Sequence, residues 1–257
     1  MLCVNGITFN MGLAHSPSII SDGLIIYLDA ANQRSYAGSG TFWYDLSGTG
    51  NTAYLINGPS FSGAGGSSVI SCDGTNDYIE VIDNSSLDFG LNNFTVEYWA
   101  KKTASTVGSD NIWGPNKWNT GASPGTNEWT LSIGNGSVGD GSGDHIEFYI
   151  ESGSTLYGIR NVNYTFLNTW KQFVGIRSGG SLVLYLNGAS IGSTSPSGMT
   201  PSTSINNVSG RNLRINNSYL NNLYTKADNS ILRIYNRALS ATEILQNYNA
   251  TRKRFGL

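Results

Sequence analysis

Apolar and polar residues alternate along most of the chain with a period of two, which is typical of β-strands that bury one face. Residues 92–101 place Phe94, Val96 and Tyr98 on one face, and residues 145–151 repeat the pattern. Roughly a dozen such segments follow one another about 8 to 15 residues apart, without alternating helices. This pattern predicts an all-β fold, an antiparallel two-sheet β-sandwich. Residues 38–51 are expected to be turns around the aromatic pair Trp43 and Tyr44.

The period changes after the last predicted strand, near the C-terminus. Ser240 and Glu243 have the spacing of a capping box, in which two side chains satisfy the first free N–H groups of a helix. Leu239 and Ile244 have the spacing of a hydrophobic staple across the same helix start. These signals predict one short C-terminal helix, from about residue 241 to 249, that covers part of the β domain.

No break in composition divides the chain, so we expect one domain over residues 23–257. Residues 1–22 have mixed polarity and no periodicity, and we expect them to form an N-terminal arm. They lack a basic start followed by a long apolar stretch, so no signal peptide is predicted. The two cysteines, Cys3 and Cys72, are too few for a disulfide framework and favour a reducing compartment.

Charged residues make up only 12% of the chain, and the formal net charge is −2. Such a chain has no strong field that would attract nucleic acid or an anionic membrane, so neither is expected as a partner. The one basic cluster, residues 252–254, is interpreted as a solvated tail. No apolar run approaches the 18 residues or so that a membrane-spanning helix needs.

Four segments in the same order resemble the concanavalin A-like lectin/glucanase superfamily, and within it the LamG-like (laminin G-like) jelly-roll modules. They are CDGTNDYIEV (72–81), NNFTVEYWAKK (92–102), WKQFVGIRSGGSLVLYLNG (170–188) and SILRIYNRALSATEI (230–244). Residues 16–51 are also similar to LamG-like structural proteins of tailed bacteriophages. The resemblance implies a concanavalin A-like jelly roll.

The same resemblance implies a non-enzymatic virion structural protein, either a capsid decoration (cement) protein or a fibre-type module. It would be assembled in the host cytoplasm and located in the virion. The N-terminal arm is then expected to contact other virion proteins, for instance by adding a strand to a neighbouring sheet. Modules of this kind often form homotrimers, although no residue pattern selects three copies over one or two.

A glucanase of this superfamily would need two carboxylates on one strand, about 5 Å apart or somewhat more if the enzyme inverts. The Glu-x-Asp-x-Glu pattern that supplies them does not occur in the sequence. Glu147 and Glu151 share a strand face but lie about 13 Å apart by strand rise. We therefore expect no enzymatic activity.

The alternative function is a carbohydrate-binding lectin module that attaches to host surface glycans. Sugars stack on exposed aromatic rings and form hydrogen bonds with amides. The loop of residues 102–127, which is rich in Gly, Asn and Ser, contains both kinds of side chain. The candidate carbohydrate-binding residues are Trp113, Asn116, Trp118, Asn119, Tyr149 and Tyr157. The competing interpretation places at least one of the tryptophans in the core.

LamG-like modules often hold one structural Ca²⁺ through Asp and Asn oxygens, so the resemblance also implies a metal site. By position, its candidate ligands are Asp29, Asp45 and Asp228. Calcium takes six to eight such oxygens. The alternative is that these aspartates cap turns.

Overall fold

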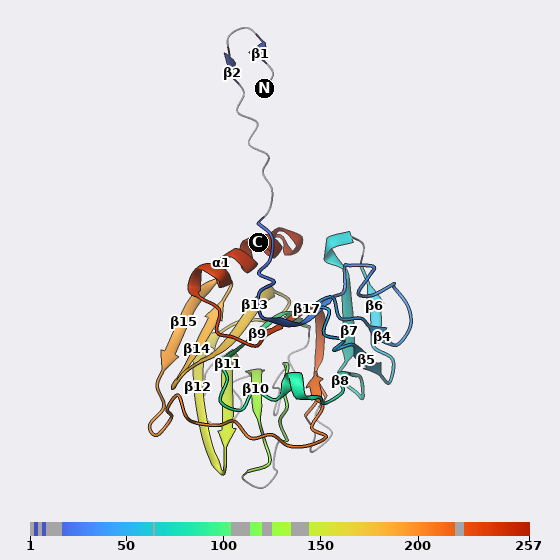
Figure 1. The fold of residues 1–257 in the computed structure, drawn as a ribbon. Coiled ribbons are helices and arrows are strands. Elements are labelled where there is room, and N and C mark those ends of the chain that lie inside the picture. Colours follow the sequence, from blue (N-terminus) through green and yellow to red (C-terminus); the bar gives the residue numbers. More distant parts are fainter. Residues whose placement is uncertain are drawn as a thin grey trace.

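Two antiparallel sheets face each other in this protein, with one α-helix outside them among the residues described (Figure 1). The computed structural model describes residues 3–4, 7–8, 17–63, 65–103, 114–119, 125–134, 144–218 and 224–257. The predicted β-sandwich with a short C-terminal helix is confirmed. A separate two-stranded ladder pairs β1 (Cys3–Val4) with β2 (Ile7–Thr8).

The larger sheet is built around β17 (Lys226–Tyr235), which pairs with β9 (Phe94–Lys102) on one side. Its other side is shared: the first half pairs with β7 (Val69–Asp73) and the second half with β3 (Leu24–Asp29). The remaining strands are β13 (Trp170–Ser178), β14 (Ser181–Leu186) and β15 (Ala189–Thr194) beyond β9, and β6 (Ser60–Ser62) beyond β7.

The second sheet consists of two groups of strands. One group is β10 (Trp129–Gly134), β11 (Asp144–Ser152) and β12 (Thr155–Tyr164); the other is β16 (Leu213–Ile215), β8 (Tyr78–Val81), β5 (Ala53–Ile56) and β4 (Phe42–Trp43). Asn116 joins the groups, because it forms a β-bridge with Thr130 of β10 and another with Arg214 of β16. Residues 42–43 were expected to be part of a turn region. In the structure they form β4, a short strand at the edge of this sheet that pairs with β5.

The core lies between the two sheets and is rich in aromatic rings. Phe94 stacks on Phe89 at 4.1 Å between ring centroids and lies 5.6 Å from Phe148 of the opposite sheet. Phe148 also packs closely against β13 of the larger sheet, at Gly175. Any larger residue there would clash, because a Cβ would lie 2.5 Å from the Phe148 ring. The alternation read from the sequence thus places one face of each sheet in this core.

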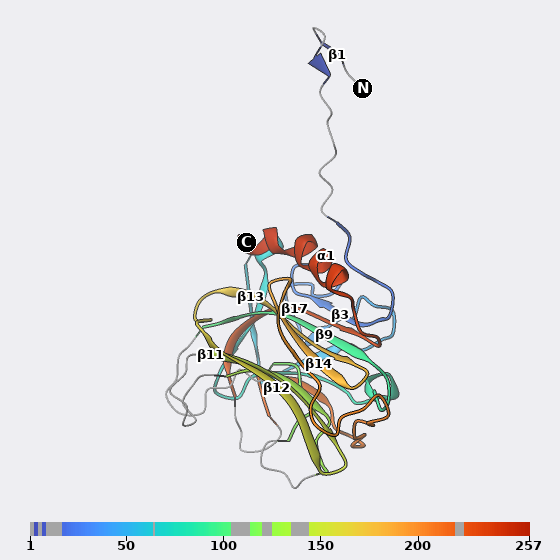
Figure 2. The same ribbon diagram turned by 90° about the vertical axis from the view of Figure 1, so that its left-hand side faces the viewer.

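The helix α1 (Ala241–Thr251) covers the outer face of the larger sheet (Figures 1 and 2). Its capping box is formed as predicted, with Glu243 N–H donating to Ser240 Oγ and Ser240 N–H donating to Glu243 Oε2. Leu239 and Ile244 pack in one cluster with Val174, Ile176, Tyr185 and Tyr235. Because this cluster fills the outer face, β17 is buried on both sides.

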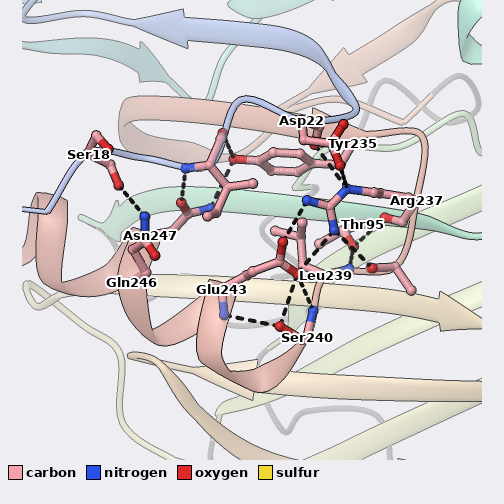
Figure 3. A network of polar contacts seen from close by, with 12 residues as sticks. Ser18, Asp22, Thr95, Tyr235, Arg237, Leu239, Ser240, Glu243, Gln246 and Asn247 are labelled. Carbon is pink, nitrogen blue, oxygen red and sulfur yellow. Dashed lines mark hydrogen bonds and ion pairs between the residues drawn. The ribbon is translucent and has the colours of Figure 1, made fainter.

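Residues 17–22, expected in the arm, are bonded to this helix and its flanking turn (Figure 3). Gln246 donates to Ser18 O at 2.8 Å, Ile20 N–H donates to Asn247 Oδ1 at 2.8 Å, and Arg237 Nε lies 2.8 Å from Asp22 Oδ2. We call these contacts the terminal latch. The folded body therefore extends to Ser18.

The C-terminal basic cluster is not a solvated tail, because it folds back as a short 3-10 helix over Arg252–Phe255. Phe255 stacks on Trp99 at 4.6 Å. Arg254 forms a two-pronged ion pair with Asp29, with 2.8 Å for each nitrogen–oxygen contact. The Trp99 ring and the buried Asp29 carboxylate therefore hold this segment on the body of the protein. Both partners are far away in the chain, so the sequence pattern does not reveal them.

Candidate functional site

An aromatic cluster lies on the outer face of the second sheet, at its β4 edge. Phe42, Tyr44 and Tyr54 are 43%, 50% and 37% exposed. The rings of Phe42 and Tyr44 lie 5.9 Å apart and nearly parallel, and those of Phe42 and Tyr54 lie 5.3 Å apart. We call these three residues the aromatic platform.

The strand alternation explains why these rings face outward. Trp43 and Ala53, their neighbours in the chain, are fully buried in the core, so Phe42, Tyr44 and Tyr54 point to the other side. The platform contains all the exposed aromatic side chains of the part of the chain that the structure describes. Apolar groups gathered at one surface site, with no packing role, are typical of a binding surface.

A charged pair lies beside the platform on the same sheet face. Glu80 is the cross-strand partner of Tyr54, and Arg214 is the partner of Glu80 in the next strand. Arg214 Nε donates to Glu80 Oε2 at 2.6 Å, and its guanidinium lies 4.8 Å from the centroid of the Tyr78 ring. The face therefore combines apolar rings with carboxylate and guanidinium groups, which can exchange hydrogen bonds with a polar ligand.

Of the predicted carbohydrate-binding residues that the structure describes, Asn116 is buried, and Tyr149 and Tyr157 lie on opposite faces of their sheet. Trp113 lies outside the described residues. Asn116 is fully buried: its amide donates to the carbonyls of Gly114, Arg214 and Asn217, and its backbone joins the two strand groups. It therefore has a structural role in the sheet.

Two further candidates lie next to Asn116 in the chain. Trp118 and Asn119 are half-buried, and their backbone N–H groups donate to Asn116 Oδ1 at 3.3 Å and to Asn127 Oδ1 at 2.7 Å. Their side chains remain candidates for contact with a ligand.

The two predicted tyrosines point to opposite faces of the sheet. Tyr149 is paired with Gly158, whereas Tyr157 is paired with Ile150, which faces the core. The Tyr149 ring lies directly against Gly158, since a Cβ there would be 1.9 Å from two ring atoms. Tyr157 packs against the core cluster. These two side chains cannot contribute to one surface site.

Each predicted calcium ligand has donors from the protein around it. Asp29 binds Arg254, and although burial alone would raise the pKa of Asp29, the bonds from Arg254 hold that pKa below its usual value. Asp228 lies 2.8 Å from Lys101 Nζ and accepts from Ser71 Oγ.

Asp45 accepts from N–H groups of the 47–51 loop, as the turn-capping interpretation expects. Within the described part of the chain, no three acidic, His or Cys residues are grouped for a metal. The calcium site stays a prediction, and residues 29, 45 and 228 remain its candidates.

The carboxylates considered for glycoside hydrolysis are held by structural contacts. Glu151 is nearly buried and accepts from the N–H groups of Gly125 at 3.1 Å and Asn127 at 2.7 Å. Glu147 Oε1 lies 3.3 Å from both His145 Nε2 and Arg160 Nε. Both carboxylates therefore have partners within the fold.

A buried charge cluster lies next to the start of β10, and no sequence pattern predicts it. The Lys117 ammonium lies 2.8 Å from Asp83, 3.2 Å from Asp88 and 3.0 Å from Glu128. Burial raises the pKa of Glu128 to about 7, while these carboxylates raise the pKa of Lys117 against the effect of its own burial. One ammonium shared among three carboxylates compensates each only in part.

No helix in the described residues is long and apolar enough to cross a membrane. A family model described as the concanavalin A-like lectin/glucanases superfamily matches residues 73–245. That span is well over half of the chain. Comparison with curated protein sequences finds no match.

Among solved structures, the binding domain of Paraclostridial Mosquitocidal Protein 1 is similar, with a TM-score of 0.64 and 18% identity over 90% of this chain and 52% of that one. The binding domain of botulinum neurotoxin serotype G has a TM-score of 0.64 and 16% identity over 88% and 50%. The serotype D domain in complex with N-acetylneuraminic acid has 0.64 and 15% over 89% and 51%. The chain thus spans about half the length of these structures, and the likeness concerns the fold.

Proposed function

Because this chain belongs to the concanavalin A-like lectin/glucanase superfamily, we propose that it is a non-enzymatic module that binds carbohydrate through the aromatic platform. The observation that carries this proposal is the contact among three exposed rings at one edge of the second sheet. The apolar face of a sugar ring stacks on such rings, which lose little conformational freedom when they bind.

The polar surroundings of the platform suit the same ligand. Glu80 accepts and Arg214 donates hydrogen bonds, so hydroxyl groups at the rim of a stacked sugar have partners of both kinds. One structural neighbour, the botulinum neurotoxin serotype D domain, was solved with N-acetylneuraminic acid bound. Sialylated glycans are therefore among the first ligands to test, beside neutral ones.

The test is a glycan array followed by titration of any ligand found. Phe42→Ala and Tyr54→Ala should each weaken binding at least about tenfold, a loss of about 1.4 kcal/mol. Leu156→Ala is the matched control, since Leu156 is an exposed apolar residue (51%) on β12, outside the platform. Unchanged affinity in both platform variants, or an array without any signal, would contradict the proposal.

A second candidate function, a structural component of a bacteriophage virion, is supported by the terminal latch. The latch fixes residues 17–22 on the folded body, so a preceding arm has a firm point of attachment. Such an arm suits a cement protein or fibre module that contacts other virion proteins, as a monomer or a homotrimer. The two functions are compatible, since a module on a particle surface can bind host glycans.

Deletion of residues 1–16 tests this second candidate, because it removes the arm and leaves the latch intact. The shortened protein should keep the melting temperature of the full chain and fail to enter assembled particles. Copy number in purified particles is the measurement. Incorporation at the level of the full chain would count against the arm as the assembly element.

A further inference from the structure

The Lys117 ammonium lies in a site that is nearly closed to solvent. The Lys117 side chain is fully buried, and the side chains of Glu128 and Asp83 are 1% and 14% exposed. Lys117 Nζ lies 2.8 Å from Asp83 Oδ1 and 3.0 Å from Glu128 Oε2. A nitrogen that can act as a nucleophile therefore contacts one carboxyl group that it can attack and a second one that can carry protons.

The fold brings these three residues together from distant parts of the chain. Asp83 closely follows β8 of one strand group, and Glu128 directly precedes β10 of the other. Lys117 follows the bridging residue Asn116, and Glu128 N–H donates to the Lys117 carbonyl at 3.2 Å. A covalent bond from Lys117 to Asp83 would therefore tie the two strand groups together at the point where Asn116 bridges them.

Both carboxylates also accept hydrogen bonds from the backbone of residues 208–210. Val208 N–H donates to Glu128 Oε1 at 3.1 Å, and Gly210 N–H donates to Asp83 Oδ2 at 2.8 Å. Nucleophilic attack on Asp83 Cγ would increase the negative charge on Oδ2. An N–H group that already contacts this oxygen stabilises the charge as it develops.

We propose that Lys117 and Asp83 form an isopeptide bond in the folded protein, with Glu128 as the proton carrier. This bond modifies the chain itself and does not depend on the proposed carbohydrate binding. The Lys117 ammonium first gives a proton to the Glu128 carboxylate, and the free amine attacks Asp83 Cγ. One Cγ–O bond then breaks, and its oxygen leaves as water with the proton returned by Glu128 and one proton from the attacking nitrogen. One ammonium and one carboxylate become one amide and one water, so no oxidant or other reactant is needed.

The electrostatics of the site suit a group that accepts a proton and then releases it. Burial raises the pKa of Glu128 to about 7, so both of its forms are populated near neutral pH. Although burial alone would lower the pKa of Lys117, the carboxylates around it raise that pKa, so the free amine is rare and the reaction is slower than folding. The fold compensates for this, because groups held in contact react as if present at about 100,000 M or more.

Mass spectrometry of the full-length protein, incubated at neutral pH and then denatured, tests for the bond. The wild type should be lighter than its sequence by one water, about 18 Da. Digestion should release a branched peptide that joins Lys117 to Asp83, which distinguishes this bond from other losses of water. Lys117→Arg keeps the positive charge and Glu128→Gln keeps the bond from Val208 N–H, and both variants should retain their full mass.

Asp88→Asn is the matched control, because Asp88 is the third carboxylate around Lys117, at 3.2 Å and with a side chain that is 22% exposed. This variant should lose one water as the wild type does, and thermal melting should show that each variant is folded. A wild type that keeps its full mass, or that loses water without the branched peptide, would overturn the proposal whether or not the variants fold. The same holds if Glu128→Gln loses water to the wild-type extent, or if the branched peptide contains Asp88 instead of Asp83.

Discussion

At the scale of single residues, the Lys117 cluster makes stability depend on pH in an unusual direction. Glu128 ionises in the unfolded chain near pH 4.5, whereas burial raises its pKa to about 7 in the folded protein. The folded state therefore binds the proton more tightly. The stability that this carboxyl contributes is fully present below about pH 4.5 and is lost as the pH rises through about 7.

Glu128→Gln should remove this dependence, because the amide keeps the bond to Val208 N–H and does not titrate. In urea unfolding between pH 5 and 8, we expect the free energy of unfolding of the wild type to fall by on the order of 2 kcal/mol relative to the variant. Asp88→Asn removes a more exposed carboxylate of the same cluster, which is only a minor cause of the raised pKa of Glu128, so this variant should keep most of the slope. Parallel curves for wild type and Glu128→Gln would refute this account.

At the scale of elements, β17 and α1 were the most predictable part of the chain. Their signals are local: alternation for the strand, and a capping box and staple for the helix. Asn116 shows where local signals end. Because its loop is rich in Gly, Asn and Ser, the sequence predicts that Asn116 contacts a sugar. In the structure, its β-bridges to Thr130 and Arg214, which are distant in the chain, give it a structural role. Pairing between distant segments leaves no mark in a single sequence.

The buried side of α1 gives a prediction at this scale. Asn247 donates to Glu97 Oε2 at 2.8 Å and accepts from Ile20 N–H, and Glu97 also holds Arg233 at 2.7 Å. Asn247→Ala removes the donor to Glu97 Oε2 and the acceptor of Ile20 N–H, and should lower the free energy of unfolding by about 2 to 4 kcal/mol. Chemical denaturation measures this loss.

Gln246→Ala is the matched control on the neighbouring position. Its amide makes a single bond of the terminal latch, to Ser18 O at the surface, so its loss should cost about 0.5 to 1 kcal/mol. Equal effects of the two substitutions would mean that the helix is held by its apolar face alone.

At the scale of the whole molecule, the sequence predicted the sandwich but not which rings reach its surface. Tyr149 and Tyr157 were grouped, although the strand register sends them to opposite faces. The sequence predicts turns around Trp43 and Tyr44, whereas Trp43 ends the strand β4 and is buried, and Tyr44, the next residue, is exposed. A shift of one residue in register exchanges the faces of a strand, and register depends on partners far away in the chain.

The position of the terminal latch has a consequence for how the protein would present itself when tethered. Residues 17–22 and the C-terminal helix both lie over the outer face of the larger sheet, whereas the three exposed rings are on the outer face of the other sheet. A support joined to either end of the folded body would therefore lie next to the outer face of the larger sheet. The three exposed rings would then point away from the support, toward the solution.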